Sequence, residues 1–586
     1  MADPHRTPSS QPPAGSFSVY QRLLRGYGPL AVLAVLMLLM ATLVPSKAPQ
    51  KVTADQSLGA ASGTTADQAG GTQAAAVPGD NTPTTSATGA AASPTGSGAP
   101  AAGARGGTGA SAGGTVAKGT PATATADVKP CPDRKEQVPG DPYTPPCVAF
   151  SGNNGGATAK GINATDIHVA YRVLNEKGFQ QTLASLAGAQ LSDSPDDIKR
   201  TINNLATFFN KRYQFYGRHI VFDFYNGVGS NTTELLGGGR DKAEADAETV
   251  KSMGDFADMS GTSEPYAAAL GARGILNFGD PYLSTAWHDQ HAPYSWSLAV
   301  DGTTVASLAA EYGVKRLAGP GGAPQKAAYA GGDLANQNRK VATMAPENSW
   351  YQDSVQVAKQ ITEKGGVKVA DNVEYQLDLG TMSNQANNII PKLKSEGITT
   401  IICGCDPVMP VFLTGEMNRE NYFPEIVVVG TALTDTDLVG QLWNQNAAKH
   451  AFGVSSLEAP VPPTKTIAYE AYKSVSPNDE PAFSVDLIYY QMQMMAIGLQ
   501  MAGPNLTAQS FQKGMFSYPA RLGPDGYWAF GPHDYTAAND VREIYWDPNA
   551  TSQYNGKQGA YIDPQPGTRW LPGQIPAGTP KIPAPR

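Results

Sequence analysis

The stretch 256–282, FADMSGTSEPYAAALGARGILNFGDPY, contains two short apolar segments that each run into small polar residues. FADM is followed by SGTSE, and GILNF is followed by GDPY. Short apolar runs bounded by turn residues are typical of buried strands. In open α/β sheets, ligands bind in the crevice beyond the carboxyl ends of the strands. Hydroxyl groups and free backbone amides at two such ends favour binding over catalysis.

Strand-like and helix-like segments alternate on both sides of this stretch. Ser194-Pro195-Asp196-Asp197 has the cap, proline and acids of a helix start, with apolar residues at helical spacing behind it. A helix over about 483–501 is apolar on all sides, which predicts burial between layers. This alternation of strands and helices predicts a parallel sheet with helices on both faces. Because the alternation continues for nearly 300 residues, we expect two α/β lobes. The other expected strands are 166–173, 219–227, 340–346, 371–376, 399–403 and 425–430.

The N-terminal region predicts a membrane segment. Residues 1–28 contain three arginines and one acid, and PLAVLAVLMLLMATLV at 29–44 carries no charge. This run is at the short limit for a spanning helix. We expect a cytoplasmic segment over 1–28, an anchor over 29–45 and an extracytoplasmic remainder in the cell membrane. A signal peptide cleaved after SKA (46–48), with secretion of the chain, is the alternative.

Low-complexity sequence surrounds the α/β region. Residues 46–127 are rich in Ala, Gly, Thr, Ser and Pro and have almost no large apolar residue, which predicts a disordered tether. Residues 128–164 form a lead-in whose Cys131 and Cys147 enclose a proline-rich loop. In an exported protein this pair predicts a disulfide. Residues 551–586 are rich in proline, and we expect them to form a tail.

Two interpretations remain for Cys403 and Cys405, which are separated by one glycine. They are either an intra-loop disulfide or two free thiols, since two thiolates without a nearby histidine make only half a zinc site. Cys-x-Cys also lacks the spacing of a typical redox pair.

Composition and motifs exclude several functions. The net charge of −8 and pI near 5.5 argue against a nucleic-acid partner. No P-loop, G-x-S-x-G, H-E-x-x-H or dinucleotide glycine pattern is present. We therefore expect no enzyme activity, no cofactor and no metal site.

The order of segments over about 165–550 resembles the type I periplasmic binding proteins, in the branch that binds leucine, isoleucine, valine and related ligands for ABC importers. Several stretches, in this order and spacing, carry the resemblance. They are DIHVAYRVLNEKG, FADMSGTSEPYAAAL with GILNFGDPY, KVATMAPENSWYQDSVQVAKQITEKGG, DLGTMSNQANNIIPKLKSEGITTIICGCDP, FSVDLIYYQMQMMAIGLQMAG and LGPDGYWAF.

The resemblance implies two Rossmann-like lobes that close around a ligand by hinge motion. Three crossings are then expected near 299, 456 and 520. Lobe 1 would consist of 165–298 and 456–520, and lobe 2 of 299–455 and 521–550.

The resemblance also implies ligand-binding positions. Asp280 stands where amino-acid binders use Thr beside the ligand carboxylate, and Ala432 stands where they use Glu for the ammonium group. Both changes argue against an ordinary amino acid and favour a ligand that has donors or positive charge. The full expected set is Ser260, Gly261, Thr262, Phe278, Asp280, Trp350, Tyr351, Asp406 and Ala432.

The expected function is extracytoplasmic capture of a small polar ligand for an ABC permease. The alternative is a membrane-tethered sensor or cell-envelope interaction module that uses the same fold without an importer.

Overall fold

The computed structural model describes residues 127, 131, 134–174, 193–279 and 282–585. The chain divides into two compact units, 1–104 and 105–586, and every described residue belongs to the second unit. The expected anchor and tether lie outside the described residues. Among the described helices, none has the length and apolar character needed to cross a membrane.

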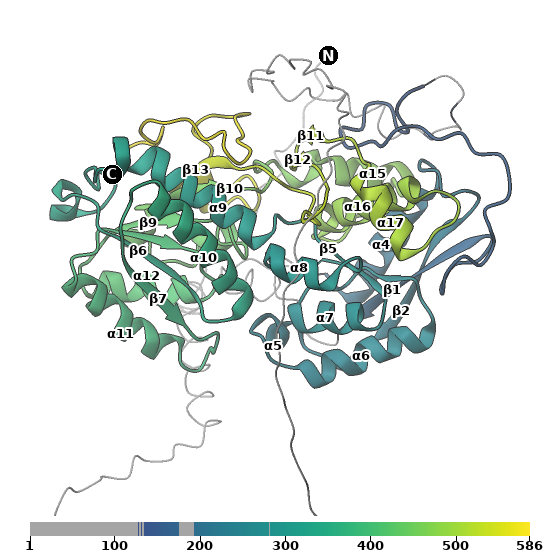
Figure 1. The fold of residues 1–586 in the computed structure, drawn as a ribbon, viewed down its shortest axis with the longest axis horizontal. Coiled ribbons are helices and arrows are strands. Elements are labelled where there is room, and N and C mark those ends of the chain that lie inside the picture. Colours follow the sequence, from purple (N-terminus) through teal and green to yellow (C-terminus); the bar gives the residue numbers. More distant parts are fainter. Residues whose placement is uncertain (1–126, 128–130, 132–133, 175–192, 280–281, 586) are drawn as a thin grey trace, which may run out of the picture. The chain divides into compact units, whose positions relative to one another are not determined.

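The first sheet has five strands in the order β2-β1-β3-β4-β5, all paired in parallel (Figure 1). Helix α4 (Pro195–Asn210) begins with the expected capping box, in which Ser194 accepts from the amide of Asp197. It packs on the same face as α15 (Ile467–Val475), α16 (Val485–Ala502) and α17 (Ala508–Phe516), while α6 (Arg240–Met253) and α7 (Glu264–Ala272) cover the opposite face. The strands are β1 (Asp166–Val173), β2 (His219–Asn226), β3 (Ala257–Asp258), β4 (Leu276–Phe278) and β5 (Ser295–Trp296).

The second sheet has seven strands in the order β14-β13-β10-β9-β8-β6-β7. Helices α9 (Gly302–Tyr312), α10 (Ser349–Lys364), α11 (Met382–Ser395) and α12 (Met409–Arg419) accompany it. Its strands are β6 (Val341–Pro346), β7 (Val369–Tyr375), β8 (Thr400–Cys403), β9 (Glu425–Val428), β10 (Ala451–Ser455), β13 (Arg542–Thr551) and β14 (Gln558–Ile562).

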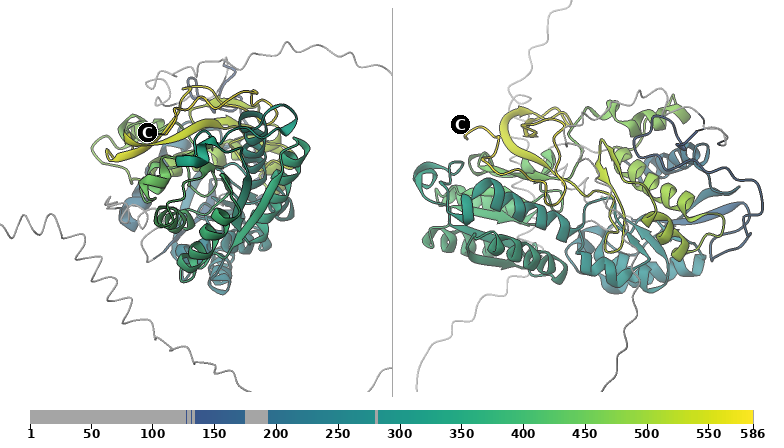
Figure 2. Two further views of the ribbon diagram at one scale, coloured as in Figure 1. Left: turned by 90° about the vertical axis from the view of Figure 1, so that its left-hand side faces the viewer. Right: turned by 45° about the horizontal axis from the view of Figure 1, so that its top comes forward.

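This second sheet is mixed rather than parallel throughout. Strand β13 pairs antiparallel with β10, and β14 pairs antiparallel with β13 (Figure 2). The prediction of a parallel sheet is therefore corrected at this edge. Strand β14 also lies inside the range 551–586 that the sequence suggests is a tail. Prolines occur in that range only after Ile562, and the edge strand before it buries three consecutive residues, Gly559, Ala560 and Tyr561.

Each sheet has its own apolar core. The first centres on Phe209, Phe278 and the helix α16, whose residues Ile488–Gln500 are all buried. This confirms the predicted burial of that helix, which has no polar face to present to water. Two further clusters cover the two faces of the second sheet.

Three segments connect the two sheets. The chain leaves β5 for α9, leaves β10 for α15, and returns from α17 through a short hairpin of β11 (Arg521–Gly523) and β12 (Gly526–Trp528) to β13. The predicted Cys131–Cys147 disulfide is present, with a Cα–Cα distance of 5.9 Å. Of the two alternatives for Cys403 and Cys405, the structure shows the disulfide, with a Cα–Cα distance of 5.0 Å.

Candidate ligand-binding site

A cavity of about 430 Å³ lies at the carboxyl ends of strands from both sheets. Its lining includes residues after β1 and β3 of the first sheet and after β8 and β9 of the second. All three connecting segments contribute as well, through Ala299, Leu457 and Asp525. A ligand here would therefore contact both lobes and the segments on which they turn.

Most hydroxyl groups of the polar loop after β3 already form hydrogen bonds with other groups of the protein. Ser260 Oγ lies 2.6 Å from Asp258 Oδ1 and accepts a hydrogen bond of 2.8 Å from the amide of Arg172. Ser263 Oγ donates to Glu234 Oε2 at 2.6 Å. Thr262 has only a long contact of 3.5 Å, to Asn231 Oδ1. Thr262 is consequently the hydroxyl of this loop that is most available to a ligand.

Beneath this loop, one cation is neutralised by two acids. The Arg172 guanidinium lies 2.8 Å and 3.3 Å from carboxylate oxygens of Glu234 and Asp246, and all three side chains are at most 3% exposed. It also stacks over the Tyr266 ring, 3.7 Å from the centroid. Burial lowers the pKa of Arg172, but the bond to Glu234 outweighs it and the pKa is raised. Arg172 therefore stays charged and fully paired.

The second-lobe side of the cavity presents an aromatic pair. Trp350 and Tyr351, on the first turn of α10, both line it and are half-buried. Trp350 also packs against the small cluster of Ala267, Leu283 and Trp287 from the first lobe. It thus forms part of the contact between the lobes as well as the cavity wall.

Asp406 lines the cavity, but its carboxylate is occupied by protein groups. Oδ2 accepts a hydrogen bond of 2.6 Å from the Tyr375 hydroxyl, and Oδ1 accepts from the amides of Val408 and Met409. Burial raises the pKa of Asp406, against these stabilising bonds. The geometry identifies Asp406 as the residue that organises the start of α12 rather than as an open acceptor.

Strained backbone also lines the cavity. Tyr282, Ala432 and Leu433 have φ of 59°, 48° and 64°, values that non-glycine residues rarely adopt. Each such residue costs of order 1–3 kcal/mol, and such strain concentrates at ligand sites.

The hairpin of β11 and β12 places an acid in the cavity wall. Asp525 occupies its turn, before Gly526 at φ 89°. Burial and the nearby Glu458 raise the pKa of Asp525 well above its ordinary value. Burial and Asp486 in turn raise the pKa of Glu458 to about 7. Among the described residues, Asp525 forms no salt bridge, unlike Glu234 and Glu264 of the same lining.

The structure brings together six of the nine positions expected to contact the ligand: Ser260, Thr262, Trp350, Tyr351, Asp406 and Ala432. Gly261 and Phe278 are not in the lining. Phe278 points instead into the first core, 5.7 Å from the Phe511 ring centroid, because side chains alternate in direction along β4. Asp280 lies outside the described residues.

Sequence reasoning missed Tyr282, Leu433, Leu457, Phe483 and Asp525 of the lining. The segment LGPDGYWAF contains a G-P-D-G turn that could have identified Asp525 as a loop-tip acid. The left-handed backbone of Tyr282 and Leu433 has no comparable sequence signal.

A bilobed α/β fold with a ligand-sized cavity at the strand ends defines the class of solute-binding proteins. A family model described as "Periplasmic binding protein" matches residues 256–551. The chain belongs to this family of periplasmic binding proteins, whose type I members serve ABC transporters and are not enzymes. No curated protein matches the sequence significantly.

Solved structures similar to this chain include three ligand-binding proteins. A fatty acid ABC transporter substrate-binding protein from Thermomonospora curvata is 14% identical, with a TM-score of 0.48 over 73% of this chain and 99% of that one. A protein from Rhodopseudomonas palustris BisB5 in complex with 3,4-dihydroxybenzoic acid is 12% identical (TM-score 0.47; 70% and 99%). A leucine-, isoleucine-, valine-, threonine- and alanine-binding protein from Brucella ovis is also 12% identical (TM-score 0.47; 71% and 98%).

Proposed function

We propose that this chain captures a small ligand in the cavity between its lobes and delivers it to an ABC-type importer. Family membership supports the transporter link. The observation that carries the ligand-capture role is the cavity itself, since its wall is made of strand ends from both sheets and all three connecting segments. Closure of the lobes on a ligand would change the contacts of every one of these elements.

The lining favours a largely apolar ligand, which differs from the small polar ligand expected from the sequence. Most of its wall is aliphatic or aromatic, with Leu235, Leu298, Trp350, Leu457 and Phe483 contributed by five different segments. Burial of apolar ligand surface stabilises a complex by roughly 25 cal/mol per Å² before the costs of association. A sugar, with hydroxyl groups on every side, would leave many of those groups without partners on such a wall.

The charges of the lining favour a ligand with an amine or another hydrogen-bond donor. In the described part of the wall the one cation, Arg172, is paired with Glu234 and Asp246, so it cannot also neutralise a ligand carboxylate. Asp525 forms no salt bridge there and lies beside the cavity. A cationic group near Asp525 would favour its charged form and gain an ion pair, whereas a carboxylate ligand would raise the pKa of Asp525 further and meet no unpaired cation in the described wall.

We propose further that residues 29–45 anchor the chain in the cell membrane and hold the binding unit on the extracytoplasmic side. The support is the arginine-flanked apolar run and the long polar segment after it. Detection of Met1–Ala48 in the protein recovered from membranes tests this. Recovery of a chain that begins near Pro49 would show cleavage instead.

Calorimetric titration with matched ligands tests the ligand class. An aromatic amine, the neutral amide of the same skeleton and the corresponding acid share one ring and carry a positive charge, no charge and a negative charge at pH 7. We expect the amine to bind most tightly and the acid most weakly. Tightest binding of the acid would overturn the proposed ligand class, and failure of all such ligands to bind would count against the cavity as the capture site.

A further inference from the structure

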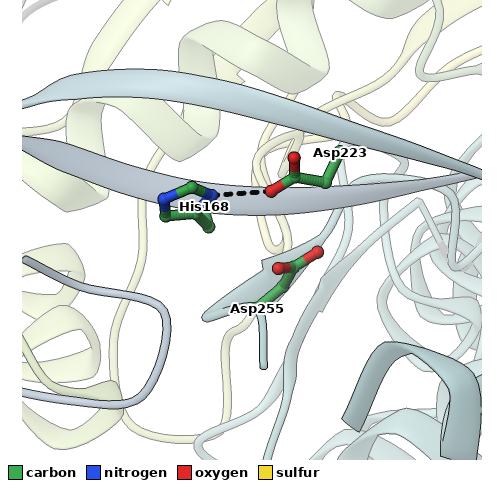
Figure 3. Close-up of side chains that lie close together, drawn as sticks. All are labelled: His168, Asp223 and Asp255. Atoms are coloured by element: carbon green, nitrogen blue, oxygen red, sulfur yellow. Dashed lines mark hydrogen bonds and ion pairs between the residues drawn. The ribbon is translucent and has the colours of Figure 1, made fainter. Parts of the chain in front are cut away.

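Away from the cavity, three side chains from separate parts of the first lobe converge on one point (Figure 3). One ring nitrogen of His168 and one carboxylate oxygen each of Asp223 and Asp255 lie within 4.8 Å of one another. None of the three lines the ligand cavity. They belong to β1, to β2 and to the turn that precedes β3.

The sheet register determines this convergence. Ala170 of β1 pairs with Asp223 of β2, and His168 lies two residues before Ala170, so His168 and Asp223 share one face of the sheet. The amide of Phe256 donates to the carbonyl of His168 at 3.0 Å, which places the neighbouring Asp255 beside the same strand. Backbone bonds therefore hold all three positions before any ligand is present.

The contacts of Asp255 within the protein do not compensate for the burial of its carboxylate. His168 Nδ1 lies 2.7 Å from Asp223 Oδ2, so these two residues partner each other. Asp255 is only 6% exposed, and its Oδ2 has no hydrogen-bond partner among the described residues. The nearby Lys160 donates to the carbonyl of Lys251. A buried carboxylate oxygen without a partner costs free energy that a bound cation would offset.

We propose that His168, Asp223 and Asp255 form a binding site for a divalent transition-metal ion. Imidazole nitrogen together with two carboxylate oxygens suits Zn²⁺ or Mn²⁺, whereas Ca²⁺ and Mg²⁺ prefer oxygen ligands alone. Two carboxylates balance the charge of a divalent ion. The side chains of His168 and Asp223 are 36% and 37% exposed, so an ion can enter from solvent and water can complete its coordination.

Such an ion would join three segments of the first lobe that are distant in sequence. The proposal is independent of the small-ligand function, because the ion would lie on the face of the sheet covered by α6 and not at the strand ends. A bound ion stabilises the folded state by mass action, so the melting temperature should rise with its concentration.

The test is calorimetric titration of the full-length chain, purified in detergent and treated with chelator, with Zn²⁺ alone. We expect Asp255→Asn and His168→Gln each to bind one Zn²⁺ fewer than the parent chain, or to bind it at least tenfold more weakly. The matched control is His533→Gln. His533 Nδ1 also contacts an aspartate, Asp289 at 2.8 Å, but no third metal-ligand side chain joins that pair in the described structure, and its Zn²⁺ binding should match the parent.

Circular dichroism establishes that each variant is folded, and the half-exposed His168 provides a variant that leaves the core intact. Zn²⁺ binding that is unchanged in both variants, or lost equally in His533→Gln, would overturn the site. Equal binding of Mg²⁺ in the same titration would overturn its assignment to transition-metal ions.

Discussion

Arg172 and Glu234 form a two-pronged ion pair beneath the ligand cavity, with Nη1–Oε1 at 2.9 Å and Nη2–Oε2 at 2.8 Å. The pair joins β1 to α5 (Asn231–Leu235) and, through Ser263, to the start of α7. Arg172 is the one cation of the described cavity wall, and this ion pair neutralises its charge. The same contact therefore stabilises the lobe and selects against anionic ligands.

Glu234→Gln should lower the free energy of unfolding by roughly 3 kcal/mol, because the buried positive charge of Arg172 then loses one of its negatively charged partners. The variant should also bind carboxylate ligands better than the parent. Urea denaturation measures the first effect. Glu248→Gln removes a partner of Arg273 from an exposed pair and should change stability far less than Glu234→Gln does. Equal losses in the two variants would contradict the structural role of the Arg172 pair.

Asp525→Asn should weaken binding of the aromatic amine about tenfold and leave the matched amide nearly unchanged. The reason is that the hairpin presents this carboxyl to the cavity without a salt bridge among the described residues. Titration calorimetry measures both affinities. Asp333→Asn, at an exposed position outside the lining, is the control. Amine binding that is insensitive to Asp525→Asn would place the cationic group elsewhere.

Stability should fall as pH rises from about 5 to 8. Burial and Asp486 raise the pKa of Glu458 to about 7 from an ordinary value of 4.5. The folded state therefore binds the proton of Glu458 more tightly than the unfolded state does. The stabilisation that this proton gives the folded state is fully present below pH 4.5 and is lost as the pH rises through 7. The difference between pKa values of about 7 and 4.5 corresponds to roughly 3 kcal/mol.

Glu458→Gln should flatten this pH dependence, whereas Glu244→Gln, at an exposed position on α6, should preserve it. Thermal melts at a series of pH values measure the slopes. Identical slopes for the parent and Glu458→Gln would show that Glu458 does not carry the effect.

Peptide mapping without reduction should recover Cys131 linked to Cys147 and Cys403 linked to Cys405. Thr431 Oγ1 donates to the carbonyl of Cys405 at 3.2 Å, and this hydrogen bond joins the loop that contains the second bridge to the loop after β9. A peptide that joins Cys131 or Cys147 to either of the other two cysteines would refute both pairings.

The strand and helix pattern could be predicted because each element has local signals. Ser194 and Pro195 define the start of α4, and the short apolar runs at 256–259 and 275–278 become β3 and β4. The antiparallel edge could not be predicted in this way, because β14 is recognised only by its pairing with β13. Residues that pair across a sheet edge leave little trace in local composition.

The candidate site was predictable in position but not in detail. Ser260 and Asp406 lie where the strand ends place them, yet their polar atoms are occupied by Asp258 and Tyr375. Such partners are remote in sequence or depend on side-chain direction, which no spacing rule supplies. The same limit applies to His168, Asp223 and Asp255, whose convergence follows from strand register alone.

The central claim, capture of one small molecule between the lobes, is tested most directly by native mass spectrometry of the full-length chain released from detergent. We expect the parent to carry the amine ligand in a 1:1 complex and Trp350→Ala to lose most of it, because Trp350 lines the cavity. Tyr469→Ala removes an aromatic ring outside the lining and should retain the complex. An equal ligand-bound fraction in Trp350→Ala and the parent, or no 1:1 complex with any ligand of the matched series, would contradict the account.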